Sequence, residues 1–549
     1  MPGEPIPAAT VHWPVQSGPV PPLAAFYSPR PETGFGAAGG PAGPGTAPAP
    51  EVGSYVLTGP GGTGKTQLAV AYARSLWETR DIELLIWITA SSRAAILAGY
   101  AEAFARASRA PGGAAMTAGL GGPPAAYGLG ADQEQLAHRF LRWLSESTRS
   151  WVVVLDDLTD AGDLAGLWPR GAMGRSVLTT RLPAASISPP RLHAQLVQVG
   201  PFSRREALGF LTARLAQDPG QRNGALDLAE SLGCLPIALS QAAALIADRS
   251  IDCRQYDGLF GDRQQAMGIT PGHGPAATVA VTWSLALDRT DELLPAGLAR
   301  PMLAMLAMLD PNGVPAEVLT GQAAREYIGS YNPDRAPAGD AEIRAALTAL
   351  AQVGLITVDA TSAARTVYLH ALAQACVRQA LPDPVRAVAG TAAANAVLEA
   401  WPEPSREPAL DQALRDCTAT LSQAAPQVAG SPEPGHRLLT RAGRSLDQAR
   451  LSGPAVAYWR AMAQASSRAA AKLDGAEAAA VIEQGGEYQQ RMAAAYEAAG
   501  RPDLAIGVLA AALEQDEEVL GPGHPGTLAA RARLAAACLT AGQPDEAVR

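Results

Sequence analysis

The pattern of hydrophobic and polar positions changes at about residue 200. Before it, short continuous apolar runs alternate with segments of helical periodicity. The runs are SYVLT (54–58), LLIWIT (84–89), WVVVLDD (151–157), RSVLTTR (175–181) and AQLVQVG (194–200). Continuous apolar strands separated by helices are typical of a parallel sheet covered by helices on both faces. We therefore predict an α/β domain with a parallel sheet of five strands over residues 51–202.

The N-terminal 50 residues have a different composition. They are rich in Pro, Gly and Ala, and such a segment buries too little apolar surface to fold alone. We interpret residues 1–50 as a tail or linker. One stretch in it, AFYSPRPETGF (25–35), carries aromatic and charged residues, and we expect it to dock on the domain that follows.

Helical periodicity dominates after residue 202. Residues 203–272 predict a small helical domain. Residues 273–385 predict three helices followed by a strand pair near LITVDA and TVYLH, which is a winged-helix pattern. Residues 386–475 predict a helical linker or degenerate repeats.

The last segment, residues 476–549, contains an internal repeat. AAYEAAGRPDLAI (494–506) and AACLTAGQPDEAV (536–548) share one frame at an offset of 42 residues. A small-residue helix, a glycine turn and a second helix beginning near Pro-Asp are typical of a tetratricopeptide unit. We predict an α-solenoid that binds a protein ligand. The sequence ends inside the second copy, so we expect further repeats in the natural protein.

Charge and cysteine usage narrow the class of protein. The net charge is −9 and the isoelectric point is about 5.4, which argues against a general nucleic-acid or anionic-membrane binder. The five cysteines form no CxxC pair, as expected for free thiols in a reducing compartment. We find neither a long apolar run nor a secretory signal, and we expect a cytoplasmic protein without membrane contact.

The first predicted strand leads into a phosphate-binding motif. Gly59, Pro60, Gly61, Gly62, Thr63, Gly64, Lys65 and Thr66 match G-x-x-x-x-G-K-[ST], and Gln67 follows in the new helix. Glycines allow backbone N–H groups to approach phosphate oxygens, and Thr66 offers its hydroxyl to Mg²⁺. Lys65 is one of two lysines beside 41 arginines. A slim ammonium fits beneath this loop, whereas a planar guanidinium does not.

Acidic and basic residues at the ends of later strands complete the predicted site. Asp156 ends the WVVVL strand and is expected to hold Mg²⁺ beside Thr66, while Asp157 is expected to orient the attacking water. Arg181 ends the RSVLTTR strand, where it is expected to sense the γ-phosphate. The predicted cofactors are ATP or ADP with Mg²⁺, and the catalytic candidates are Asp157, Lys65 and Arg181.

The motifs GPGGTGKTQLA, VVVLDDL, GRSVLTTR, PFSRREALGFL and LGCLPIAL occur in an order that resembles the NB-ARC branch of the STAND signal-transduction ATPases. With its repeat tail the chain is similar to the NB-ARC–tetratricopeptide regulators of actinomycetes. The resemblance implies that Pro236 contacts adenine, that Arg30 (with Glu32) lies near the base, and that His370 touches the ADP β-phosphate. The aspartate that usually follows this histidine is replaced by Ala371.

The resemblance also implies a mechanism. ADP would hold a closed, inactive monomer, a signal read by the repeats would favour ATP, and the open form would assemble as a homo-oligomer. We expect a weak regulatory ATPase. Two alternatives stay open: a transcription regulator that binds DNA through the winged helix, and a tetratricopeptide scaffold with a non-hydrolysing nucleotide site. Residues 271–380 carry seven arginines and ten acidic residues, a net charge of −3 that argues against DNA docking.

Overall fold

The structure, a computed structural model, forms two compact units, residues 1–202 and 203–549, and each is described by itself. The residues it describes are 12–24, 26–30, 33, 35, 53–111, 133–187, 192–270, 274–293, 297–331, 336–360, 362, 364–403, 407–429, 436–449, 452–471, 475–498, 500–519, 521–543 and 547.

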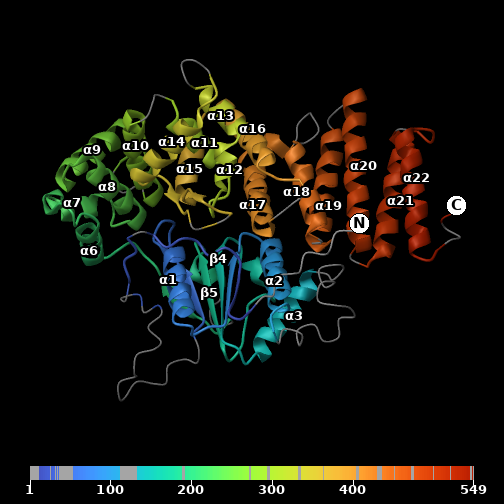
Figure 1. The fold of residues 1–549 in the computed structure, drawn as a ribbon, viewed down its shortest axis with the longest axis horizontal. Coiled ribbons are helices and arrows are strands. Elements are labelled where there is room, and N and C mark those ends of the chain that lie inside the picture. The colour runs from blue at the N-terminus through green and yellow to red at the C-terminus, as the bar shows by residue number, and fades with distance from the viewer. Residues whose placement is uncertain are drawn as a thin grey trace, which may run out of the picture. The chain divides into compact units, whose positions relative to one another are not determined.

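The first unit is built on a six-stranded sheet in the order β1-β3-β4-β5-β2-β6, and every pairing in it is parallel (Figure 1). The strands are β1 (Val15–Ser17), β2 (Tyr55–Thr58), β3 (Leu84–Thr89), β4 (Trp151–Leu158), β5 (Gly174–Thr180) and β6 (Gln195–Gln198). Because all strands run the same way, their carboxyl ends meet at one edge of the sheet.

Helices cover both faces of this sheet (Figure 1). Helix α1 (Lys65–Glu78) packs on one face, where its Leu68, Val70 and Ala73 join a buried cluster with alternate strand residues. The other face is covered by α2 (Arg93–Ala107) and α3 (Gln133–Glu146), and a short α4 (Ala184–Ile187) follows β5. The predicted α/β class and its five strands are confirmed.

The structure adds one strand that the sequence did not predict. Residues 15–17 of the N-terminal segment form β1, which pairs with β3 at the edge of the sheet. The interpretation of residues 1–50 as a tail or linker is therefore wrong for this stretch. Further along, Tyr27 and Phe35 pack against the buried cluster on the α1 face. The described residues of the stretch 25–35 therefore dock on this domain, as expected.

A β-bulge interrupts the pairing of β4 with β5. Leu155 pairs with Leu178, but the next pair is Leu158 with Thr180, so β4 has one residue more than its partner over this interval. Asp157 lies in the bulge with a φ of 56°, in the left-handed region that non-glycine residues seldom adopt. The bulge brings two consecutive aspartates to the edge at which the parallel strands end.

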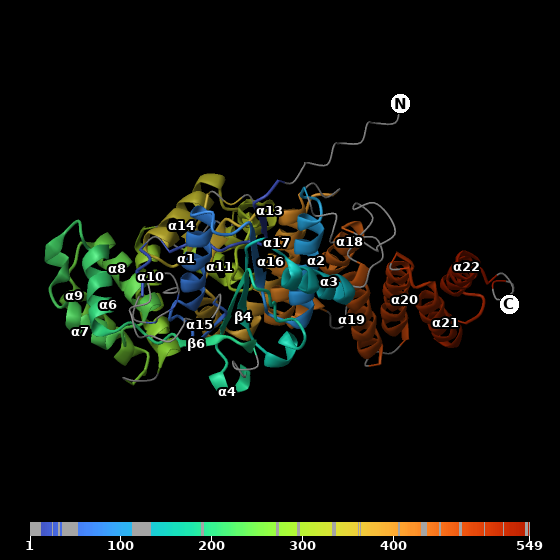
Figure 2. The same cartoon turned by 90° about the horizontal axis from the view of Figure 1, so that it is seen from below.

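The second unit is helical apart from one hairpin, within the residues that the structure describes. Its helices follow one another from α6 to α22 (Figure 2). They are α6 (Arg204–Arg214), α7 (Ala225–Ser231), α8 (Pro236–Arg249), α9 (Cys253–Ala266), α10 (Pro275–Leu293), α11 (Ala299–Leu306), α12 (Ala316–Thr320), α13 (Gln322–Gly329), α14 (Asp340–Gln352), α15 (Ala371–Ala380), α16 (Asp383–Glu399), α17 (Pro408–Ala424), α18 (Arg437–Gln448), α19 (Ser452–Ala470), α20 (Gly475–Ala498), α21 (Pro502–Val519) and α22 (Pro525–Thr540).

The hairpin of the second unit joins β7 (Thr357–Val358) to β8 (Val367–Tyr368), which pair antiparallel. Between these strands Arg365 is buried. Its Nη1 donates to Asp310 over 2.5 Å, and its Nη2 donates to Asp416 of α17. A buried guanidinium requires carboxylate partners, and Asp310 and Asp416 supply them. The bond to Asp416 connects the hairpin to α17.

The C-terminal helices have the geometry that the repeat predicts. Helix α20 ends at Ala498, Gly500 adopts a φ of 70°, and α21 begins at Pro502. The second copy repeats this order, since α22 is followed by Gly542 with a φ of 75°. The described helices include none that is long and apolar enough to cross a membrane.

Candidate functional site

The loop between β2 and α1 has the backbone that a phosphate cradle requires. Gly59, Gly62 and Gly64 adopt positive φ values of 152°, 79° and 90°. A Cβ atom at Gly59 would lie 2.2 Å from the Val199 carbonyl oxygen, so only glycine fits there. Helix α1 begins at Lys65 without a side-chain cap, and no acidic residue lies in its first turn. Its N-terminal N–H groups therefore favour an anion.

Lys65 lies inside this loop. Its Nζ donates to Gly59 O over 2.9 Å and to Pro60 O over 2.7 Å, and the residue is only 8% exposed. Burial, followed by the nearby positive charge of Arg181, lowers the pKa of Lys65 to about 8. A phosphate beside this ammonium would replace the two carbonyl partners and relieve the repulsion between the cations.

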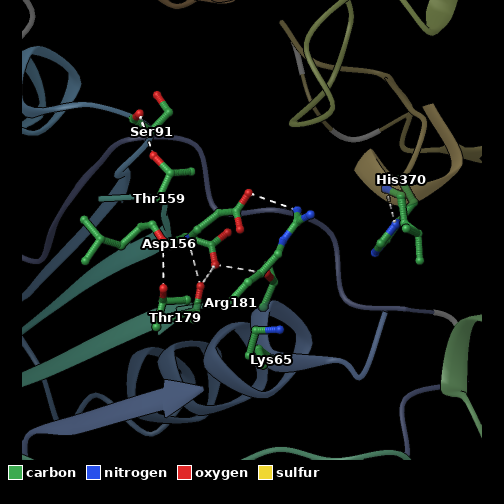
Figure 3. Close-up of polar contacts among 12 residues, drawn as sticks. Lys65, Ser91, Asp156, Thr159, Thr179, Arg181 and His370 are labelled. Atoms are coloured by element: carbon green, nitrogen blue, oxygen red, sulfur yellow. Dashed lines mark hydrogen bonds and ion pairs between the residues drawn. The ribbon is translucent and has the colours of Figure 1, made fainter. Parts of the chain in front are cut away.

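Asp156 lies within hydrogen-bond distance of the first turn of α1, the helix that follows the phosphate-binding loop of residues 59–66 (the P-loop). Thr66 Oγ1 donates to Asp156 Oδ1 over 2.9 Å, and Thr179 Oγ1 donates to the same oxygen over 2.5 Å (Figure 3). Helix α1 follows β2, and β5 lies between β2 and β4 in the sheet. The contact from Thr66 on α1 to Asp156 on β4 therefore passes over the end of β5. Burial is the largest cause that raises the pKa of Asp156, to about 6, and the two hydroxyl bonds oppose it.

Asp157 and Arg181 form a partly exposed ion pair beside this cluster. Arg181 Nη2 lies 3.2 Å from Asp157 Oδ2, and the two side chains are 48% and 40% exposed (Figure 3). The backbone N–H of Asp157 donates to Thr179 Oγ1 over 2.8 Å, which fixes the bulge. Both side chains are therefore about half exposed to solvent.

Sequence reasoning did not single out Thr179, although it connects the two aspartates. Its hydroxyl accepts a bond from Asp157 and donates one to Asp156. The signal was present in the strand RSVLTTR, whose two polar residues interrupt an apolar run just before Arg181. In a buried strand such hydroxyls require partners, and a neighbouring strand end with carboxylates supplies them.

Two predicted site residues join the N-terminal segment to the rest of the first unit, Arg30 to the loop and Gln67 to α1. Arg30 donates to Gly200 O and Pro201 O, each over 2.9 Å, and reaches Thr63 O at 3.4 Å. The Gln67 side chain accepts from Ala24 N over 2.6 Å and so holds this segment on α1. Glu32 lies outside the described residues.

Pro236 and His370 belong to the second unit. Pro236 is the first residue of α8, where its missing N–H has no cost, and it follows Gly233 and Cys234 in left-handed conformations. His370 caps α15, since its Nδ1 accepts a bond of 3.1 Å from Leu372 N (Figure 3). Their predicted roles as adenine and phosphate contacts stay predictions.

Comparison with known families gives two matches in the second unit. The tetratricopeptide repeat family model matches residues 488–549, which confirms the predicted repeats. A domain of unknown function, DUF7779, matches residues 291–385, which contain the β7–β8 hairpin. No curated protein sequence matches the chain at a significant level.

Comparison with solved structures gives distant similarities. A STAND protein with a tetratricopeptide repeat sensor from Pyrococcus horikoshii is 12% identical, with 96% of this chain and 77% of that chain covered and a TM-score of 0.43. The ORC2 protein of Aeropyrum pernix, solved as ADPNP–ADP complexes, is 13% identical over 62% and 88%, with a TM-score of 0.22. A kinesin light chain-like repeat protein of Podosopora anserina is 18% identical over 38% and 82%, with a TM-score of 0.23.

Proposed function

We propose that this chain is an ATP/ADP-dependent signal-transduction switch with slow ATP hydrolysis. The nucleotide would bind in the loop of residues 59–66, and the repeats would bind a protein ligand. The observation that carries the proposal is the contact of Thr66 with Asp156 at the mouth of a loop that already buries Lys65. A phosphate cradle, a lysine and a hydroxyl–carboxylate pair are the parts that a triphosphate with its metal requires.

The residues present fit Mg²⁺ and a nucleotide. Thr66 Oγ1 and the Asp156 carboxylate supply oxygen ligands, which Mg²⁺ prefers, and burial raises the pKa of Asp156, so a bound cation would favour its charged form. Bound Mg²⁺ would neutralise part of the negative charge of the nucleotide phosphates. Lys65 would hold the phosphates, and Thr179 would keep the Asp156 carboxylate directed toward Thr66.

Asp157 and Arg181 are proposed to act on the outermost phosphate. In this structure they neutralise each other as an exposed pair. Arg181 would leave Asp157 to contact a γ-phosphate, and Asp157 would then accept a hydrogen bond from the attacking water. We expect turnover to be slow, because a switch whose output depends on the lifetime of its bound nucleotide gains nothing from fast hydrolysis.

The second unit is proposed to respond to the nucleotide. Pro236 would contact the base and His370 the β-phosphate in the ADP state, as the resemblance to STAND ATPases implies. The order of a sheet domain, helices, a hairpin-containing domain and repeats supports this division of labour. ATP is proposed to favour an open form that assembles as a homo-oligomer.

The experiment is mass spectrometry of gently purified protein, followed by size measurement with ADP and with ATP. The switch predicts about one bound ADP per chain, a monomer with ADP and a larger species with ATP and a protein ligand. Protein that carries no nucleotide and binds none when it is added would leave the repeat scaffold as the better explanation. Tight, salt-sensitive binding to duplex DNA would favour the transcription regulator.

A further inference from the structure

Three segments of the first unit meet at one guanidinium group. Arg30 donates from Nη1 to Gly200 O and from Nη2 to Pro201 O, each over 2.9 Å. Its Nη1 also lies 3.4 Å from Thr63 O in the P-loop, and its guanidinium stacks over the Phe202 ring at 5.1 Å. A planar fork that donates to two adjacent carbonyls fixes their direction as well as their distance.

Residues 200–202 are the segment through which the chain passes from one unit to the next. Strand β6 ends at Gln198, and Ser203 begins the second unit as the N-cap of α6. Ser203 and Glu206 form a capping box, so regular helix starts directly after the segment. A constraint on residues 200–202 therefore acts directly before the first helix of the second unit.

The start of this segment also touches the start of the P-loop. Val199 N donates to Thr58 O over 2.8 Å, and the Val199 carbonyl oxygen occupies the space that a Cβ at Gly59 would need. The two backbones are packed against each other without intervening side chains. The start of the P-loop and residue 199 are therefore in direct backbone contact.

The N-terminal segment that carries Arg30 is also bonded to α1, through the residues that precede Arg30. Gln67 of α1 bonds Ala24 N and Pro22 O, and Arg74 of the same helix donates to Pro21 O over 3.4 Å. Tyr27 packs against the buried cluster on this face. The segment is thus anchored on α1 independently of the Arg30 guanidinium.

We propose that Arg30 is a positioning residue that couples the P-loop to residues 200–202. In the nucleotide-free arrangement it holds the connecting segment against the loop. When a phosphate draws Lys65 away from Gly59 O and Pro60 O, the loop carbonyls shift, and Arg30 carries the shift from Thr63 to Gly200. The part of this proposal that involves phosphate rests on the proposed function; the anchoring of residues 200–202 does not.

The first test is limited trypsin digestion of the full chain without nucleotide. Cleavage after Arg204 and Arg205, followed by mass spectrometry, reports on the first turn of α6. Arg30→Met is expected to speed this cleavage about tenfold, because two charge-assisted bonds are lost together. Arg30→Lys is expected to resemble Arg30→Met, since an ammonium cannot hold two carbonyls in a fixed fork. Arg74→Met is the matched control and is expected to leave the rate unchanged.

Two results of that digestion would overturn the anchoring. One is cleavage of Arg30→Met within about twofold of the parent, and the other is an equal rise for Arg74→Met. An equal rise for Arg74→Met would mean that the loss of any contact made by the N-terminal segment speeds cleavage after Arg204 and Arg205.

The second test is the rate of ADP release, followed with a fluorescent ADP analogue. Arg30→Met is expected to release it about tenfold faster than the parent, and Arg74→Met at the parental rate. Unchanged release beside faster cleavage would refute the coupling to the P-loop. If the parent itself binds no ADP, the proposed function and the phosphate half of the coupling both fail, while faster cleavage of Arg30→Met would still support the anchoring.

Discussion

Thr66 donates a hydrogen bond of 2.9 Å to the carboxylate of Asp156, which lies 90 residues further along the chain on β4, a strand that β5 separates from the strand β2 preceding α1. The contact joins the first turn of α1 to the end of β4 across β5. It brings the hydroxyl and the carboxylate that the sequence suggested as metal ligands to one point.

Lys65→Arg is expected to lose nucleotide affinity by at least about tenfold, although it keeps the positive charge. The Lys65 Nζ is enclosed by the loop and bonded to two of its carbonyls, and a planar guanidinium is too wide for that space. Isothermal titration with MgADP measures the effect. Lys65→Ala is the reference for complete loss, and an arginine variant with parental affinity would show that charge alone suffices.

Thr179→Val is expected to weaken the Mg²⁺-dependent part of nucleotide affinity by about tenfold while the fold is kept. Valine has nearly the same shape but cannot donate to Asp156 or accept from Asp157 N. Affinities measured with Mg²⁺ and with a chelator separate this part from phosphate binding. Thr179→Ser should restore it, and a valine variant with the parental dependence on Mg²⁺ would count against the proposed positioning.

Asp157→Asn is expected to bind ATP normally and to hydrolyse it about a hundredfold more slowly than the parent. Asparagine tolerates the left-handed conformation of this residue, so the bulge should be preserved. The exposed pair with Arg181 contributes little to stability. Single-turnover hydrolysis measures the effect, and unchanged turnover would remove Asp157 from the mechanism.

The cap of α18 is expected to make this helix sensitive to mild acid. His436 Nδ1 accepts from Leu438 N over 3.1 Å, so the neutral ring carries its proton on Nε2, which lies 2.9 Å from Asn395 Oδ1. Burial, then the charge of Arg437, lowers the pKa of His436 below its usual 6.5. The unfolded chain therefore takes up the proton first, and this stabilisation is present above pH 6.5 and is lost as the pH falls through the folded pKa.

His436→Asn tests this cap, because asparagine accepts the same bond at every pH. Between pH 7.5 and 5.5 the parent should lose about 1 kcal/mol of protection in the first turn of α18, and the variant should not. Hydrogen exchange at residues 437–440 measures it. His138→Asn, on the exposed side of α3, is the control, and equal loss of protection in the parent and His436→Asn would refute the cap's role.

The sequence predicted the parallel sheet because each inner strand is a continuous apolar run, as in WVVVL. It did not predict β1, whose three residues VQS carry no such pattern and owe their conformation to pairing with β3. Short edge strands of this kind are set by tertiary contacts, and the surrounding Pro and Gly residues favoured a different interpretation.

The candidate site was likewise predictable from the sequence only in part. The loop and Asp156 followed from local motifs, because their spacing alone determines which strand ends and helix starts carry them. The bulge at Asp157 and the bridging role of Thr179 depend on the register between β4 and β5, which no local pattern specifies. The arrangement of Arg30 beside Gly200 and Pro201 likewise joins segments that lie 170 and 171 residues apart.

The central claim, that a nucleotide and its metal bind where α1 meets Asp156, is tested most directly by a titration of MgADP into the parent, Thr66→Val and Asp156→Asn. We expect stoichiometric binding to the parent and affinities at least about tenfold weaker for both variants when Mg²⁺ is present, with smaller differences in a chelator. A parent that binds no nucleotide, or variants that bind MgADP as tightly as the parent does, would contradict the account.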